Sequence, residues 1–211
     1  MIILVYPIFK RIVLLPLRLF LKKIGGIENI PKKGPFIVTS NYASYLDPWL
    51  IASVIIPLKN KKIHYLAKKG RFWDLSGDRI ARDYFGLVLL EGRKEEAFKD
   101  ILNLLKKGSI VGILIEGDRS SDGKLKKGKT GVAKLALEAK VPILPIGLVG
   151  TYDIAPGKKL IPKLRRAKMH IGKPIYLNKY YKRDINEKLL RKLTNDVMHV
   201  ISKLSGKPYT H

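Results

Sequence analysis

Two kinds of apolar run alternate along most of the chain, and segments rich in polar residues and glycine separate them. Short, dense apolar runs predict β-strands at residues 35–39, 62–67, 86–90, 110–115, 142–148 and 167–171. Longer stretches whose apolar residues recur at helical spacing predict α-helices at residues 48–57, 94–106, 129–140 and 185–204. Strands that alternate with helices are typical of α/β proteins, in which helices cover a largely parallel sheet.

Two of the expected strands are continuous apolar runs, at residues 110–115 and 141–149. A strand with one face in water alternates apolar and polar positions, whereas an unbroken apolar run is typical of a strand covered on both faces. The last expected helix carries Leu189, Leu193 and Val197 at helical spacing, so it packs through one face. We therefore expect an α/β fold with a mixed, mostly parallel sheet that is flanked by helices on both sides.

The N-terminal segment is strongly apolar but contains Lys10, Arg11 and Arg18. A membrane span needs about 20 predominantly apolar residues, so this segment is a poor transmembrane helix. It also lacks the basic start and the cleavage pattern of a signal peptide. Apolar residues with interspersed basic ones suit a helix that lies in the membrane interface, with a helix packed on the domain as the alternative. The expected organisation is an amphipathic helical segment at 1–24 and one α/β domain at 25–211.

Composition adds a large positive charge, because 42 Lys and Arg residues face 17 Asp and Glu residues and give a net charge of +25. Such an excess implies an anionic partner, such as lipid headgroups, phosphorylated small molecules, an acidic protein or nucleic acid. No basic strand with interleaved aromatic residues and no recognition helix is evident, so we expect no specific nucleic-acid binding. The absence of cysteine excludes thiolate chemistry. None of the four histidines has metal-ligand spacing, so we expect no metal.

A polar loop, Ser40 to Pro48, joins a predicted strand to a predicted helix. Open α/β sheets build their sites in such loops, at the carboxyl ends of the strands. Asp47 followed by Pro48 suits the start of a helix, with Asp47 as the capping residue. Tyr42 precedes Asp47 by five positions in this loop.

A second polar block, Glu116-Gly117-Asp118-Arg119-Ser120, follows the apolar strand expected at 110–115. The planar guanidinium group of arginine presents a fork of donors that suits phosphate oxygens. Glycine lets the backbone approach a ligand closely. The block alone also fits an ordinary polar loop with a Glu–Arg pair.

The order and spacing of these blocks resemble the glycerolipid acyltransferase family, the 1-acylglycerol-3-phosphate acyltransferases. Asn41 to Asp47 resembles the family's Asn-His-x-Ser-x-x-Asp loop, and Glu116 to Ser120 resembles its Glu-Gly-Thr-Arg-Ser block. Ala67-Lys68 and Val141 to Ile146 are similar to the family's Ala-Lys pair and its Val-Pro-Ile-x-Pro-Val strand. The resemblance runs from about residue 26 to residue 176.

The resemblance implies transfer of a fatty acyl group from acyl-carrier protein or acyl-CoA to the free hydroxyl of lysophosphatidic acid, a step of phospholipid biosynthesis. It implies catalytic roles for Tyr42 and Asp47. It further implies substrate or phosphate binding by Lys68, Arg93, Glu116, Gly117 and Arg119. No cofactor is implied beyond the thioester co-substrate. The implied partners are a lysophospholipid, the acyl carrier and an anionic membrane, with the protein peripheral or monotopic on its cytoplasmic face.

One position departs from the family pattern, because Tyr42 stands where the family has histidine. In the family, that histidine takes a proton from the acceptor hydroxyl and the aspartate orients the imidazole. A phenol has a reference pKa near 10, so roughly one in a thousand is ionised at neutral pH. Either Tyr42 supports acyl transfer, or the protein is a catalytically impaired relative that binds phospholipid or acyl carrier in the same pocket. If Tyr42 is an engineered replacement of histidine, the protein is likewise a catalytically impaired form.

A rival motif lies in the segment Gly123 to Thr130, which formally satisfies the Walker A pattern. A phosphate-binding loop of that kind begins directly after a buried strand. Here residues 118–122 separate the strand from the first glycine. In the family, the corresponding segment only connects the preceding block to a helix, so we do not expect nucleotide binding.

Overall fold

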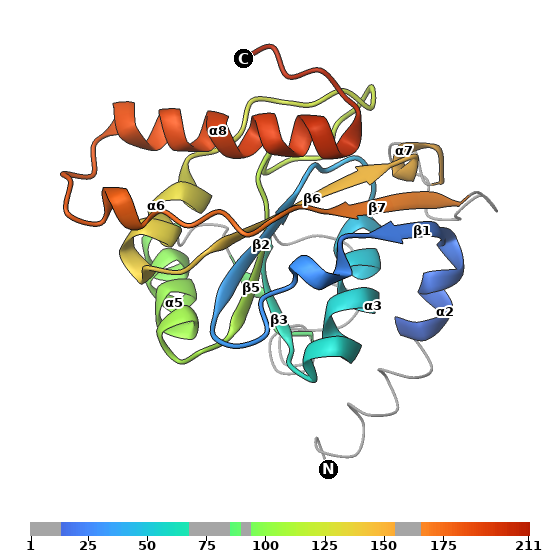
Figure 1. Cartoon of the computed structure of the whole chain (residues 1–211), viewed down its shortest axis with the longest axis horizontal. Coiled ribbons are helices and arrows are strands. Elements are labelled where there is room, and N and C mark those ends of the chain that lie inside the picture. Colours follow the sequence, from blue (N-terminus) through green and yellow to red (C-terminus); the bar gives the residue numbers. More distant parts are fainter. Residues whose placement is uncertain (1–13, 68–84, 90–93, 155–165) are drawn as a thin grey trace.

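The computed structural model describes residues 14–67, 85–89, 94–154 and 166–211, and strands from all four ranges form one sheet (Figure 1). The strands are β1 (Leu21–Gly25), β2 (Phe36–Ser40), β3 (Ile63–Ala67), β4 (Val88–Leu89), β5 (Ile110–Leu114), β6 (Ile143–Val149) and β7 (Ala167–Ile171). Their spatial order is β1-β7-β6-β2-β5-β3-β4. All neighbouring pairs are parallel except β6 and β7. The mixed, mostly parallel sheet expected from the sequence is thus confirmed.

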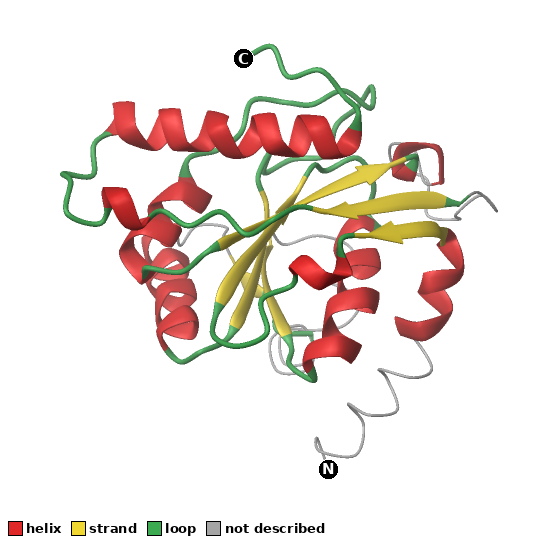
Figure 2. Cartoon of the chain, viewed as in Figure 1, coloured by secondary structure: helices red, strands yellow, loops and turns green. Residues whose placement is uncertain are grey.

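Helices cover both faces of this sheet (Figures 1 and 2). Their bounds are α2 (Leu15–Leu17), α3 (Asp47–Lys59), α5 (Lys94–Lys106), α6 (Gly131–Ala139), α7 (Thr151–Ile154) and α8 (Glu187–Ser205), with 3-10 turns at Arg18–Phe20, Ile27–Asn29 and Asn178–Tyr180. α2 and α3 pack on one face, and α5, α6 and α8 pack on the other. Each face holds its own apolar core, which explains why the central strands are apolar on both sides.

Local capping signals mark the ends of α3 and α8. Asn186 caps α8, because its Oδ1 accepts a hydrogen bond from the Leu189 amide at 2.9 Å. Gly206 ends the same helix in the left-handed conformation, with φ of +66°. Asn60 ends α3 in the same way, with φ of +50°. These local signals agree with the helix boundaries inferred from hydrophobic spacing to within a few residues.

The helical segment expected at residues 1–24 does not extend that far, which corrects the predicted boundary. Residues 1–13 lie outside the described residues, and beyond them α2 and a 3-10 turn reach only to Phe20. Leu21–Gly25 forms strand β1, which pairs in parallel with β7. Leu14 is fully buried in the core beneath α3. The described part of the segment belongs to the α/β domain because the edge of β7 and this core offer it backbone hydrogen bonds and burial.

None of the described helices is both long and apolar enough to cross a bilayer.

The chain topology brings three loops to one edge of the sheet. From β2 the chain passes through α3 to β3, two strands away, and β5 later enters between them while β6 takes the other side of β2. β2, β5 and β6 are mutually parallel, so their carboxyl ends lie at the same edge. Ligand sites of open α/β sheets form at such a point, where the direction of strand order reverses.

Candidate functional site

Asn41 fixes the loop that follows β2. Its Nδ2 donates to the carbonyl of Leu148 at 3.0 Å, and its Oδ1 accepts from the Leu148 amide at 2.8 Å. The side chain is buried. Its two hydrogen bonds to Leu148 extend the pairing of β2 with β6 by one residue beyond the end of β2. The polar loop therefore starts from a fixed backbone position.

Asp47 lies fully buried at the start of α3. The residue is the first of the helix, with Leu46 in the capping position, so the predicted cap role is wrong in detail. Instead, Asp47 Oδ2 accepts hydrogen bonds from the amides of Ala43 and Ser44 at 2.7 and 2.8 Å. The carboxylate thus folds its own loop back over the helix start.

The second oxygen of the same carboxylate, Asp47 Oδ1, has no hydrogen-bond partner among the described residues. The buried hydroxyl of Thr151, at the start of α7, also has none there. Burial raises the pKa of Asp47 to about 6, and the two loop amides, the Thr151 hydroxyl and the charge of Lys207 oppose that rise. Thr151 therefore lies close to Asp47. A buried carboxylate with one free oxygen is unusual and marks the place as a functional candidate.

The main chain of Tyr42 is held from both sides by the loop after β5. Its amide donates to Glu116 Oε1 at 2.7 Å, and its carbonyl accepts from the Ser120 amide at 2.8 Å. Burial raises the pKa of Tyr42 to about 12, while the charge of Arg119 opposes the rise. The phenol is therefore protonated at neutral pH, so it is a hydrogen-bond donor and a very poor base.

Glu116 joins the two loops. One carboxylate oxygen accepts from the Tyr42 amide, and the other accepts from the Lys126 amide at 2.7 Å. Burial raises the pKa of Glu116, and these amides and the nearby charges of Lys207 and Lys126 lower it again. Both oxygens are engaged with backbone, so the structure gives Glu116 a clamping role, and direct contact with substrate stays a prediction.

Arg119 lies against an aromatic ring of the first loop. Its guanidinium carbon is 3.2 Å from the centre of the Tyr45 ring, a stacked cation–π arrangement. Its positive charge also acts to lower the pKa of Tyr42. The sequence placed Arg119 with Tyr42 and Asp47 in one site, and the structure brings the three together at the carboxyl ends of β2 and β5.

Gly117 is required by the backbone, and the end of the Lys129 side chain lies close to it. Its φ is +75°, and a Cβ atom there would come within 2.5 Å of Lys129 Nζ. Lys129 in turn pairs with Asp118, with 3.1 Å between Nζ and Oδ2. The acid beside the expected phosphate site thus has a cationic partner.

Lys68 and Arg93, the remaining expected phosphate-binding residues, lie outside the described residues. Their contribution to the site stays a prediction.

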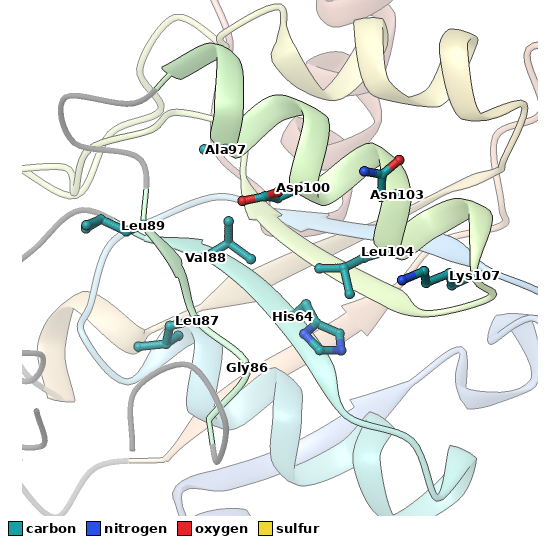
Figure 3. Close-up of a pocket in the computed structure, with 10 residues that line it drawn as sticks. All are labelled: His64, Gly86, Leu87, Val88, Leu89, Ala97, Asp100, Asn103, Leu104 and Lys107. Atoms are coloured by element: carbon teal, nitrogen blue, oxygen red, sulfur yellow. The ribbon is translucent and has the colours of Figure 1, made fainter. Parts of the chain in front are cut away.

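His64 is not a substitute for the missing histidine. It lines a hollow of about 480 Å³ beneath α5, together with Leu104 and Lys107 (Figure 3). Tyr65, the next residue of β3, points to the other face, where its hydroxyl donates to the carbonyl of Pro48 at 3.0 Å. Because neighbouring strand residues face opposite sides, His64 is separated from Asp47 by the sheet.

Lys207 and Thr151 belong to the site but were missed by sequence reasoning. Lys207 follows α8, and its Nζ donates to the carbonyl of Gly123 in the loop after β5. Its charge lowers the pKa of both Asp47 and Glu116. No sequence signal distinguishes it from the other lysines, since only the docking of α8 brings it here.

Comparison with known proteins shows which proteins this chain is similar to. A sequence model of the family described as "Acyltransferase" matches residues 22–149. The chain is 32% identical over 165 residues to a chloroplast 1-acyl-sn-glycerol-3-phosphate acyltransferase of Brassica napus, covering 74% of this chain and 45% of that protein. It is 30% identical over 167 residues to the 1-acyl-sn-glycerol-3-phosphate acyltransferase of Bacillus subtilis, covering 76% of this chain and 79% of that protein. The chain thus spans less than half the length of the plant relative.

Among solved structures, the fold is similar to the crystal structure of the 1-acyl-sn-glycerophosphate (LPA) acyltransferase of Thermotoga maritima. The TM-score is 0.71 at 25% sequence identity, and the match covers 95% of this chain and 83% of that one.

Proposed function

The chain belongs to the acyltransferase family, and on that premise we propose that it transfers a fatty acyl group to the free hydroxyl of lysophosphatidic acid. The observation that supports this most is the meeting of Tyr42, the buried Asp47 and Arg119 at one edge of the sheet. The relatives from Brassica and Bacillus carry the name of that reaction.

In the proposed reaction, the acceptor oxygen attacks the carbonyl carbon of a thioester. The new O–C bond forms, the C–S bond breaks, and the proton of the acceptor hydroxyl ends on the leaving thiolate. Arg119 binds the phosphate of the acceptor through its fork of donors. Tyr42, as a neutral phenol, donates a hydrogen bond within the site, and ionised Asp47 supplies the negative charge that favours loss of the hydroxyl proton.

A second candidate function is favoured by the state of Tyr42. With a pKa of about 12, only about one phenol in 10⁵ is ionised at pH 7. Asp47 Oδ1 also lacks the partner that a histidine would supply. These two observations favour a catalytically impaired relative that binds phospholipid or acyl carrier in the same pocket.

Acyl transfer to lysophosphatidic acid, measured for the wild type, Tyr42→His and Asp47→Ala, separates the two candidates. Activity in the wild type that disappears in Asp47→Ala supports a transferase that works without histidine. Turnover in Tyr42→His alone supports the impaired relative. If no form turns over while all bind the lysophospholipid, the proposed reaction is wrong.

The donor is proposed to be acyl-CoA or acyl-carrier protein. Both carry a phosphate group at the end of the arm that bears the thioester. A hollow of about 560 Å³ beside the site supports an anionic donor, because Lys124, Lys126 and Lys127 line it. Initial rates measured with acyl-CoA and with acyl-carrier protein that bear the same acyl chain identify the donor. Equal rates with a thioester that has no phosphate would oppose this assignment.

We also propose peripheral association with the cytoplasmic face of an anionic membrane. The net charge of +25 supports it, as do exposed apolar side chains beside the packed helices α2 and α3. Leu15, Leu19 and Leu58 are 43%, 71% and 51% exposed. Sedimentation with anionic and with zwitterionic vesicles, over a salt series and with duplex DNA as competitor, tests the proposal. Binding to DNA that is as tight as binding to anionic vesicles would overturn it.

A further inference from the structure

The last turn of α8 is pressed directly onto β6 and β7. A Cβ atom on Gly147 would lie 2.4 Å from the carbonyl carbon of Leu204, and one on Gly172 would lie 2.9 Å from Leu204 Cδ1. His170 Nδ1 forms a hydrogen bond of 2.7 Å with the Leu204 carbonyl. The helix end therefore has a single position relative to the sheet, because no side chain separates the two backbones at Gly147.

The residues after α8 are fixed as well. Gly206 turns the chain with φ of +66°, and the Lys207 amide then donates to the Ser202 carbonyl at 3.2 Å. Two positions further on, Tyr209 is buried, and its hydroxyl donates to Asn195 Oδ1 at 3.0 Å. Lys207 thus leaves the helix in a direction set by contacts on both sides of it.

The side chain of Lys207 points back to the loop between β5 and α6. Its Nζ donates to the carbonyl of Gly123, seven residues after Glu116. Both buried carboxylates of the site, Asp47 and Glu116, experience its positive charge. Lys207 therefore touches the second loop of the site and acts electrostatically on the first.

The surroundings of Asp47 explain why a cation matters there. Besides the amides of its own loop, the groups that act on it include Tyr42 from the loop after β2, Tyr65 from β3, Thr151 from α7 and Lys207 from the segment after α8. Two of these groups are phenols and one is an aliphatic hydroxyl. Of these four groups, Lys207 is the one that carries a positive charge.

We infer that Lys207 is a positioning residue of the site, which holds the loop of Glu116 and Arg119 through the Gly123 carbonyl and offsets the buried charge of Asp47. The inference rests on the proposed function, because it assigns Lys207 a task in acyl transfer. A buried carboxylate without such a cation shifts toward its neutral form, and a neutral Asp47 cannot favour loss of the acceptor's proton.

The first test compares three variants in acyl transfer over pH 5.5 to about 9. Lys207→Gln keeps a donor for Gly123 and loses the charge, and Lys207→Arg keeps both. Lys203→Gln removes the same charge from an exposed position one turn earlier on α8. We expect the acidic limb of the profile to move up by about half a pH unit or more in Lys207→Gln only. A purely structural tether would lower the rate at every pH without moving the limb.

The second test needs no acyl transfer, so it remains valid if the proposed reaction is wrong. Unfolding free energy is measured against pH for the same variants, each with Asp47 and with Asp47→Asn. We expect Lys207→Gln to be destabilising above pH 6 relative to Lys203→Gln, and most of that difference to vanish with Asp47→Asn. Equal behaviour of Lys207→Gln and Lys203→Gln in both tests would overturn the inference.

Discussion

Tyr42 and Asp47 lie in one loop, five positions apart, yet no hydrogen bond joins the Tyr42 hydroxyl to Asp47 in the described structure. Oδ2 of the carboxylate is occupied by two loop amides, and Oδ1 is buried and unpartnered. The loop thus retains the acid that would orient an imidazole, and it holds a phenol that does not use it.

Tyr42→His is expected to raise kcat for acyl transfer by about 10² or more, because a positioned general base contributes about 10²–10⁴ in rate. The imidazole would find Asp47 Oδ1 free to fix its tautomer. Steady-state kinetics with lysophosphatidic acid measures the gain. Tyr42→Phe is the control for loss of the phenol alone. If Tyr42→His is slower than the wild type, the phenol has a catalytic role that histidine does not replace.

Asp47→Asn is expected to abolish acyl transfer and to stabilise the fold at neutral pH. The pKa of Asp47 is raised from 3.8 to about 6 by burial, so the folded state binds this proton more tightly than the unfolded chain. The contribution of Asp47 to the wild-type free energy of unfolding is therefore fully present below about pH 4. It decreases as the pH rises to about 6 and stays lower above that. Removing the charge should recover on the order of 1–3 kcal/mol at pH 7.

Denaturant unfolding at pH 4.5 and at pH 7 measures this effect. The advantage of Asp47→Asn over the wild type should be small at the lower pH and larger at the higher one. An advantage that is equal at both pH values would mean that the charge of Asp47 is not its source.

Arg119→Gln is expected to raise KM for lysophosphatidic acid by about tenfold or more, because charge-assisted and bidentate hydrogen bonds to phosphate are lost. Monoacylglycerol, which has no phosphate, is the matched acceptor and should be affected much less. Arg119→Lys keeps the charge without the fork and without the planar stack on Tyr45. A similar KM change for both acceptors would contradict phosphate binding by Arg119.

Gly117→Ala is expected to destabilise the protein by about 1–3 kcal/mol and to reduce activity, since φ of +75° is strained for alanine and the new Cβ meets Lys129. Gly34→Ala is the control, because Gly34 has φ of +82° but has no atom within 4 Å of the added Cβ. Thermal unfolding of both variants separates backbone strain from the steric contact. Equal losses would show that Lys129 moves aside without cost.

The sequence predicted the elements whose signals are local. The end of α5 at Lys106 and both ends of β7 (Ala167–Ile171) match the prediction residue for residue, because their hydrophobic spacing is a local signal. β1 was missed, since Lys22 and Lys23 break its apolar pattern and its partner β7 lies more than 140 residues away in the chain. An edge strand of this kind is defined by the pairing it completes, and its own residues give little sign of it.

The site shows the same division. The family pattern identified Tyr42, Asp47 and Arg119, which lie in loops directly after strands, and the structure brings them together. It gave no sign that Asp47 Oδ1 would be left without a partner, because that depends on how a tyrosine side chain is placed. Lys207 was missed because its position depends on the docking of α8. Local sequence patterns identify residues that can take part in a site, whereas long-range packing decides which charged groups lie close together.

The absence of a side chain at Gly147 also constrains how this protein can be recombined with others. Leu204 rests on the bare backbone of β6 there, so a C-terminal helix taken from a homologue would seat correctly only on a strand that has glycine at the same place. A larger residue at that position of β6 would lift the helix and move the residue that follows it at position 207 away from the Gly123 carbonyl. Strand and helix must therefore be exchanged as a pair.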